Sequence, residues 1–400
     1  MHFLQFVMSK NTINGSSINI TKIQSESIDI LRFPLAIMVI FIHENPNVIN
    51  LIDADFSLLS GHGFYNMTGI LLSHVLTHIA VPTFFFISGF LFFINFQSWS
   101  WNVYKKKIRS RVKSLIIPYI IWNSISFILT LSVMIAGGII KGNPFYNVLA
   151  LLSKKSWHIF YDCNEWGTTR TNWLGENLRM TGPYDFPLWF LRDLIVVTIL
   201  TPIIYYAIKK LKLLIIGILF LAYISRIWTL LPGFQITAFF FFFTGAYFAL
   251  NKLNIIQFAN KNKILFVPIC LILLVATVIY DSVSTEIGQN IYPLFVCSGV
   301  FTAFYITSIC VLNFNVKPNK LLVSSCFFIY AFHTVELPLI GSPLSFVSMV
   351  LHKIIPGNTG IEDGICYLAT PFLTAFLCIV VLMIARHLFP KVTLLFSGNK

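Results

Sequence analysis

Two ionisable residues lie eleven positions apart in an apolar stretch, DILRFPLAIMVIFIHEN, that runs from Asp29 to Asn45. Arg32 is near its start and His43 near its end. On an α-helix this spacing is close to three turns, so both side chains share one face, about 16 Å apart at ~1.5 Å per residue. Such groups are costly inside a membrane unless something satisfies them, so the shared face favours a functional helix. Alternatively, Arg32 reaches the inner headgroups and His43 lies at the interface.

Other apolar segments also carry ionisable residues. Arg192 and Asp193 lie in PLWFLRDLIVV, Arg226 lies in YISRIW, and His333 and Glu336 lie in FFIYAFHTVELP. We expect these residues at one depth of the membrane, around a shared polar cavity that opens outward. The adjacent pair can instead be purely structural, because neighbouring helix positions point in different directions.

A dense basic run, YKKKIRSRVKSLIIPY, leads into another apolar segment and contains Arg109, Arg111 and Lys113. One interpretation is anchoring to anionic lipids, and the other is a phosphate site, because arginine forms bidentate contacts with phosphate oxygens. Just before this run, VPTFFFISGF places Ser88 and a glycine together. Small residues there allow close approach of a second helix or of a thin ligand.

Composition places these residues in a polytopic helical membrane protein. Of 400 residues, 56% are hydrophobic and 11% are charged, and the mean hydropathy is +0.79. We therefore predict an all-α fold of about ten transmembrane helices, with a kink at Pro82 in the second because proline removes a backbone donor. The predicted spans are 28–46, 68–95, 114–138, 187–208, 212–231, 235–251, 263–280, 291–312, 322–341 and 366–388.

The distribution of charge predicts the orientation. With both termini cytoplasmic, Lys and Arg gather in the inner segments and acidic residues in the outer loops, as the positive-inside rule requires. The net charge of +13 is then a signal of topology in a multi-pass protein of the cell's inner (plasma) membrane, and nucleic acid is not needed to explain it. The seven cysteines show no metal-ligand spacing, and a disulfide between Cys163 and Cys366 is conceivable but unsupported.

Three regions follow from this layout: a polar cytoplasmic leader over 1–26, a membrane domain over 27–390, and a cytoplasmic tail over 391–400. The membrane domain includes a long outer loop, 141–186. Aromatic rings with polar edges suit sugars, although the loop's ends also fit an interfacial aromatic belt. The aromatic residues concerned are Trp157, Tyr161, Trp166, Trp173 and Tyr184.

Several of these motifs together resemble the membrane-bound acyltransferase-3 family. They are Arg-x10-His, VPTFFFISGF, the basic run ending in IPY and followed by W-N, WFLRDL and IYAFH, in the family's order from about residue 25 to 390. The resemblance implies ten spans and transfer of an acyl group, often acetyl from coenzyme A, to extracytoplasmic sugars. It also implies that His43 is the catalytic base and that Arg32 belongs to the donor site. The family's Arg-x-x-Arg pair is incomplete, because Arg111 is followed by Ser114; Lys113 or Arg109 can substitute.

The predicted reaction is direct transfer to a sugar hydroxyl, with His43 as base and Glu44 beside it to polarise the site. Arg192, Arg226 or His333 would stabilise the oxyanion, and the co-substrate is acetyl-CoA or another acyl-CoA, with no bound cofactor. The expected partners are the acyl-CoA donor, a cell-surface or lipid-linked glycan and the bilayer. Two alternatives remain: a secondary transporter built on the same His, Arg and Glu residues, and a non-catalytic relative.

Overall fold

The computed structural model describes residues 20–44, 61–96, 98–140, 148, 157–171, 177–226, 228, 231–280, 285–356 and 360–398. The leader before residue 20, much of the outer loop including Trp173, and residues 399–400 of the tail lie outside the described residues, so the predictions made for them stay predictions.

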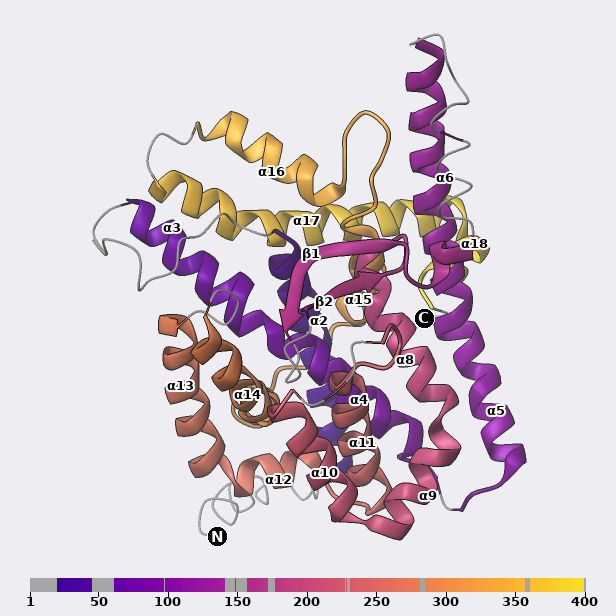
Figure 1. The fold of residues 1–400 in the computed structure, drawn as a ribbon, viewed down its shortest axis with the longest axis vertical. Helices are drawn as coiled ribbons and strands as arrows, with labels where there is room; N and C mark the ends of the chain where they lie inside the picture. Colours follow the sequence, from indigo (N-terminus) through magenta and orange to yellow (C-terminus); the bar gives the residue numbers. More distant parts are fainter. Residues whose placement is uncertain are drawn as a thin grey trace.

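Helices make up most of the described chain (Figure 1). The first half contains α2 (Ile20–Glu44), α3 (Gly61–Gly69), the π turn η2 (Ile70–Val75), the 3-10 turn η3 (Leu76–Ile79), α4 (Ala80–Phe93), α5 (Trp101–Arg111), the π turn η4 (Val112–Ile116), α6 (Ile117–Ile140), η5 (Trp157–Phe160), η6 (Phe186–Leu188), α8 (Trp189–Ile199) and α9 (Thr201–Leu211). The second half contains α10 (Leu213–Ile224), α11 (Ile236–Leu250), α12 (Ile255–Lys261), α13 (Lys263–Tyr280), α14 (Glu286–Asn313), α15 (Lys320–Phe332), α16 (Pro343–Ile354), α17 (Gly360–Leu388) and α18 (Pro390–Phe396).

By length and composition, five described helices can cross a membrane, or up to seven if each of two bent pairs forms one span. The first pair bends by 63° between α8 and α9, where Pro202 in the first turn of α9 lacks the N–H that would continue the helix. The second bends by 103° between α11 and α12, where the Asn254 side chain caps the new helix. The polytopic helical character is therefore confirmed, while ten spans and cytoplasmic termini remain predictions.

The second predicted span is one helical segment with an irregular middle. The π turn η2 and the 3-10 turn η3 both precede Pro82, which lies in the first turn of α4. Because a proline at this position cannot bond back to the carbonyl four residues earlier, the ladder is disturbed upstream of the ring. The departure from helical geometry therefore falls within Ile70–Ile79, before the proline itself.

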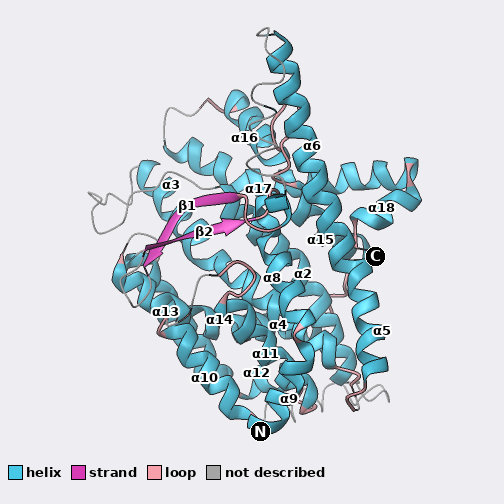
Figure 2. Cartoon of the chain, turned by 45° about the vertical axis from the view of Figure 1, so that its right-hand side comes forward, coloured by secondary structure: helices cyan, strands magenta, loops and turns pink. Residues whose placement is uncertain are grey.

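One part of the described chain is not helical. Strands β1 (Asn164–Thr171) and β2 (Asn177–Gly182) form an antiparallel two-stranded sheet, visible as the two magenta arrows in Figure 2. This hairpin lies within the predicted outer loop and departs from a purely helical fold. The prediction that the ninth span runs to residue 341 also fails, because α15 ends at Phe332 and a tight turn bridged by Leu337 and Gly341 follows.

Helix α2 lies in the centre of the bundle and contacts α4, α12, α14, α15 and α17 (Figure 1). Next to it, α4 and α11 pack with almost touching backbones. A Cβ added at Gly89 would lie 2.1 Å from the Phe242 carbonyl oxygen, and one at Gly245 would lie 2.0 Å from that of Phe86. Gly89, the glycine of the SGF segment, therefore allows close packing of α4 on α11. Of the two interpretations given for it, a second helix and a thin ligand, the structure supports the helix.

Candidate active site

The first end of the site is built around Arg32 of α2. Its Nη1 donates to the Asp29 carboxylate at 2.8 Å, one turn earlier on the same helix, and its side chain is mostly buried. The guanidinium of Arg111, from the end of α5, comes close enough to Arg32 for the two charges to repel each other. Two permanent cations held this close favour an anionic ligand between or beside them.

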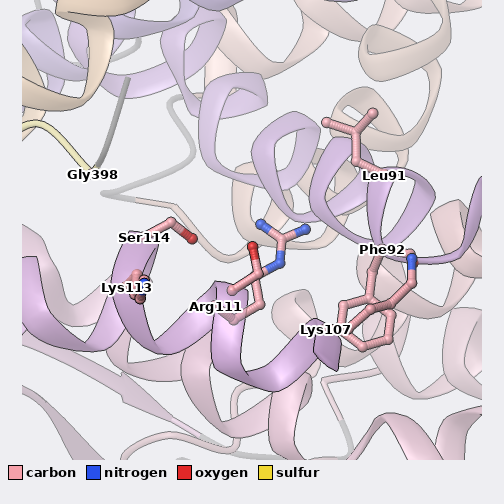
Figure 3. A pocket seen from close by; sticks show the side chains of 8 residues that line it. Leu91, Phe92, Lys107, Arg111, Lys113, Ser114 and Gly398 are labelled. Carbon is pink, nitrogen blue, oxygen red and sulfur yellow. The ribbon is translucent and has the colours of Figure 1, made fainter. Parts of the chain in front are cut away.

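A cavity of about 420 Å³ lies next to these cations. In Figure 3, Arg111 projects into the middle of the opening, with Lys113 and Ser114 on one side and Phe92 and Lys107 on the other. None of the lining residues is acidic, so the electrostatic field inside favours negative charge. The lining residues are Leu91, Phe92, Lys107, Ser110, Arg111, Lys113, Ser114 and Gly398.

The aromatic ring of Phe92 helps to hold the basic side chains in place. The Arg111 guanidinium carbon lies 5.9 Å from the ring centroid and the Lys107 Nζ lies 5.2 Å from it. Lys107 also donates to the Phe92 backbone carbonyl. These cation–π contacts orient the cations without neutralising them, so their charge stays available to a ligand.

The structure separates the predicted donor residues. Arg111 and Lys113 line the cavity, whereas Arg109 is exposed and Ser88 is only partly buried, and neither is among the lining residues. Ser114, which stands where a second arginine is expected, also lines it. Sequence reasoning missed Lys107, although the signal was present, because it precedes Arg111 by four residues and so shares its helix face.

The second end of the site is built around His43, in the last turn of α2. Its ring centroid lies 5.2 Å from that of His333, which follows the end of α15, and 5.5 Å from that of Phe186 in η6. His78 of η3 also lies within electrostatic range of His43. Four elements far apart in the chain therefore meet at this imidazole.

The tautomer of His333 follows from its contacts. Its Nδ1 lies 3.0 Å from the backbone carbonyl oxygens of both Ile329 and Tyr330, so this nitrogen carries the hydrogen and donates it. The side chain is fully buried, and its Nε2 has no hydrogen-bond partner among the described residues. The neutral ring therefore presents a bare lone pair at Nε2.

Glu44 turns away from its neighbour His43. Its carboxylate lies near the Thr370 side chain of α17, whose hydroxyl donates to the Cys366 carbonyl at 2.8 Å, and its Oε2 is buried without a hydrogen-bond partner in the described part of the chain. Consecutive helix positions point in different directions, so this placement is expected from geometry. Glu44 faces α17 beside His43 and does not orient the imidazole by direct contact with it.

The irregular turns before α4 supply polar groups that the sequence did not single out. The Ser73 hydroxyl donates to the Phe41 carbonyl at 2.5 Å and lies 2.8 Å from the Tyr367 hydroxyl, while His78 Nε2 lies 3.0 Å from the Ser73 carbonyl oxygen. The π turn thus ties α2 to α17 at Phe41, two residues before His43. The available signal was the polar residues of an apolar span just upstream of Pro82.

Arg192 and Asp193 form a buried ion pair, with Nε and Nη2 of the arginine each 3.0 Å from Oδ1 of the aspartate. Arg192 Nη1 donates to the backbone carbonyls of Tyr161, at 2.9 Å, and Thr181, at 3.3 Å. Asp193 Oδ2 is buried without a hydrogen-bond partner among the described residues. The carbonyl contacts of Arg192 connect α8 to the segment after η5 and to β2.

Two further candidates lie away from the histidines' contacts. Arg226, in a left-handed backbone conformation after α10, donates from Nη1 to Gln289 Oε1 at 2.9 Å. Glu336 is exposed in the turn after α15. The predicted shared cavity therefore does not gather all the ionisable residues, and His333 is the candidate that contacts His43.

Tyr161 and Tyr184 of the predicted outer loop make contacts that hold the loop against the rest of the protein. The Tyr161 hydroxyl donates to the Pro232 carbonyl at 3.0 Å, and the Tyr184 ring packs edge-on against Phe127. None of the seven cysteines, all within the described residues, forms a disulfide, so the conceivable Cys163–Cys366 bond is absent. The use of this loop for sugar binding stays a prediction.

Comparison with protein-family models gives one match, described as an acyltransferase domain, over residues 25–386. A search of the curated proteins and a search of the solved structures each gave no significant match. The family match begins just before Arg32 and ends after α17 has passed Thr370, so both ends of the site lie inside it.

Proposed function

Because the chain belongs to the acyltransferase-3 family and is a multi-pass helical protein, we propose that it moves an acetyl group from acetyl-CoA to a hydroxyl of an extracytoplasmic or lipid-linked polysaccharide. The observation that carries the proposal is the placement of two different sites along α2. Arg32 lies within electrostatic range of Arg111, which lines a cationic cavity, and a contacting pair of imidazoles lies at the His43 end of the helix.

The cationic cavity fits the charged portion of an acyl-CoA. A coenzyme A nucleotide carries several phosphate charges, and Arg111, Lys113 and Lys107 line the cavity without a carboxylate among its walls. In the predicted orientation this cavity faces the cytoplasm, where acyl-CoA is made. The thin pantetheine arm then follows α2 from Arg32 toward His43, about 16 Å along the helix at ~1.5 Å per residue.

The imidazole pair fits the chemistry of acyl transfer to an alcohol. A hydroxyl is a poor nucleophile at neutral pH, so His43 takes its proton as the oxygen attacks the thioester carbonyl. The new C–O bond forms, the C–S bond breaks, and the CoA thiolate receives the proton from His43. The products are an O-acetyl ester and free CoA, and His43 returns to its neutral state without forming an acyl-enzyme.

The test is a transfer assay with purified protein in liposomes. Radiolabelled acetyl-CoA and a lipid-linked or cell-wall glycan fraction are supplied, and both free thiol and labelled glycan are measured. We expect the two products in equal amounts, with neither formed when the glycan is omitted. Uptake of a solute without thiol release would instead identify a transporter, and neither activity would identify a non-catalytic relative.

A further inference from the structure

The Nε2 atom of His333 is a buried polar atom that the mechanism above does not use. Leaving such an acceptor unpaired costs about 1–3 kcal/mol, so native proteins rarely do so without a reason. The atom belongs to a fully buried ring whose nearest described imidazole contact is His43, at 5.2 Å between centroids. The unpartnered Nε2 of His333 lies beside His43, the proposed base, and this position suggests that it takes part in the reaction.

We propose that His333 is a positioning residue for His43. Its Nε2 accepts the N–H of His43, and this bond holds the other ring nitrogen of His43, with its lone pair, toward the acceptor hydroxyl. The inference rests on the proposed function, because His43 needs a fixed tautomer only if it takes up a proton.

As a neutral ring, His333 can act toward a neighbouring group only as a hydrogen-bond acceptor. Nδ1 donates its hydrogen to the carbonyls of Ile329 and Tyr330, so Nε2 has no hydrogen to give and can only accept. This arrangement does not suit the oxyanion role that the sequence suggested, because an oxyanion needs a donor. It does suit an acceptor that selects the tautomer of a neighbouring imidazole.

The surrounding structure holds His333 firmly enough for this task. The backbone N–H of Leu344 donates to the His333 carbonyl at 3.1 Å, and the Tyr330 hydroxyl, one turn earlier, donates to the Pro187 carbonyl. Pro187 follows Phe186, whose ring packs edge-on against His43. The segment 186–187 therefore contacts His43 directly and holds Tyr330, one turn before His333, so it helps to fix the positions of both imidazoles.

The two rings are tilted by 49°, and no hydrogen bond joins them in the resting structure. Rotation of the His43 side chain is the motion that aligns N–H with Nε2, and such bonds commonly tighten only when the substrate is bound. When His43 takes the hydroxyl proton, it becomes an imidazolium with two N–H groups. One faces the departing thiolate and the other faces His333, which lowers the energy of that charged state.

The other titratable groups around the imidazoles are His78 of η3, Glu44 of α2 and Tyr367 of α17. None of them offers the combination found in His333, a fixed Nδ1–H and an unpartnered Nε2. His78 Nε2 faces the Ser73 carbonyl, and Glu44 faces Thr370.

The experiment compares His333→Leu, which removes the acceptor, with His333→Gln, whose side-chain oxygen can replace it. The matched control is His352→Ala in the last turn of α16, where the histidine is nearly half exposed. We expect His333→Leu to lower kcat by about 10- to 100-fold, with the KM for acetyl-CoA unchanged, and His333→Gln to recover much of the loss. The acid limb of the kcat/KM profile should move to lower pH in His333→Leu, because the imidazolium has lost its acceptor.

An unshifted pH profile in a folded, impaired His333→Leu protein would reduce His333 to a structural residue and overturn the inference. If His333→Leu does not fold, His333→Phe, which keeps a ring but has no acceptor, takes its place: a lowered kcat that His333→Gln recovers supports the acceptor role, and equal kcat in both variants contradicts it. Absence of transfer by the unmodified protein would sink the proposed function itself. An active parent with fully active His333 variants would sink only the positioning role.

Discussion

The His43–His333 pair and the Arg192–Asp193 pair are both made of ionisable side chains inside the helical bundle, but they differ in what holds them. In the arginine–aspartate pair the two charges lie 3.0 Å apart and Arg192 also donates to two backbone carbonyls, although Asp193 Oδ2 has no hydrogen-bond partner among the described residues. In the histidine pair, one nitrogen of His333 is left bare next to an imidazole that it does not bond. The first pair therefore balances opposite charges within the protein, whereas the second leaves a neutral acceptor facing a neighbouring imidazole.

This difference separates a structural role from a chemical one. A buried pair whose charges are matched and whose donors reach backbone carbonyls stabilises the loops that it joins, and removing one partner is costly. A buried acceptor without a partner stabilises nothing in the resting protein. The comparison predicts that damage to the first pair appears in stability, and damage to the second in rate.

The largest expected effect is on the rate of transfer in His43→Ala. Loss of a positioned base typically lowers the rate by about 10²–10⁴. We expect the variant to fold and to bind acetyl-CoA as the parent does, measured by thermal unfolding and by equilibrium binding. His43→Gln should fail to a similar degree, because an amide does not take up a proton at neutral pH. Acetylation at the parental rate by His43→Ala would contradict the mechanism.

The next effect is on stability in Arg192→Gln. Removing one partner of a buried ion pair typically costs about 3–5 kcal/mol, because the other charge is left uncompensated. Thermal unfolding should show a strong loss for the single variant and a smaller one for the double variant Arg192→Gln/Asp193→Asn, which leaves no charge behind. The folded fraction of the single variant should retain kcat within tenfold. A selective collapse of kcat would instead restore the oxyanion role suggested by the sequence.

The basic cavity offers a matched pair of arginines for a third prediction. Arg111 lines the cavity and Arg109, two residues earlier, is exposed outside it. A hydrogen bond to a charged group is typically worth about 1.5–3 kcal/mol, so Arg111→Gln should weaken acetyl-CoA binding roughly 10- to 100-fold. Arg109→Gln should change it little. Equal losses in both would mean that the basic run acts through general attraction to anionic lipids.

The sequence predicted best where a single helix carries the pattern. Arg32 and His43 lie on one unbroken helix, α2, and Arg111, from the basic run that the sequence singled out, approaches Arg32. These features depend on helix geometry alone, which fixes the direction of each side chain once the segment is known to be helical.

The sequence predicted worst where regular helix geometry stops. Ser73 and His78 reach the site because η2 and η3 depart from the α-helix, and helix periodicity does not describe such turns. Glu336 was placed on a helix that ends four residues before it, at Phe332. Contacts such as His43 with Phe186 join residues far apart in the chain, and no local pattern contains them.

The smallest expected effect concerns Asp185, which directly precedes Phe186, the residue whose ring packs against His43. Its backbone N–H donates to Asn123 Oδ1 at 2.9 Å, while its carboxyl is almost fully buried and Oδ2 lacks a hydrogen-bond partner in the described structure. Burial raises the pKa of this carboxyl well above the ordinary aspartate value. Like Asp193, Asp185 has one unpartnered carboxylate oxygen, but it forms no ion pair within the described residues.

A pH titration of stability distinguishes the two roles for Asp185. Because the pKa is higher in the folded protein than in the unfolded chain, the folded state holds the proton more tightly. The resulting stability is fully present below the unfolded value of about 3.9 and is lost as pH rises through the raised folded pKa. Asp185→Asn cannot ionise, so its Tm relative to the parent should rise with pH across this window, by a shift on the order of 2 °C. Asp363→Asn, at a partly exposed position, is the control and should follow the parent. A Tm difference between Asp185→Asn and the parent that does not change with pH would mean that Asp185 does not titrate as its burial requires. A fall in the kcat of Asp185→Asn without loss of stability would give Asp185 a role in the reaction, like that proposed for the two histidines.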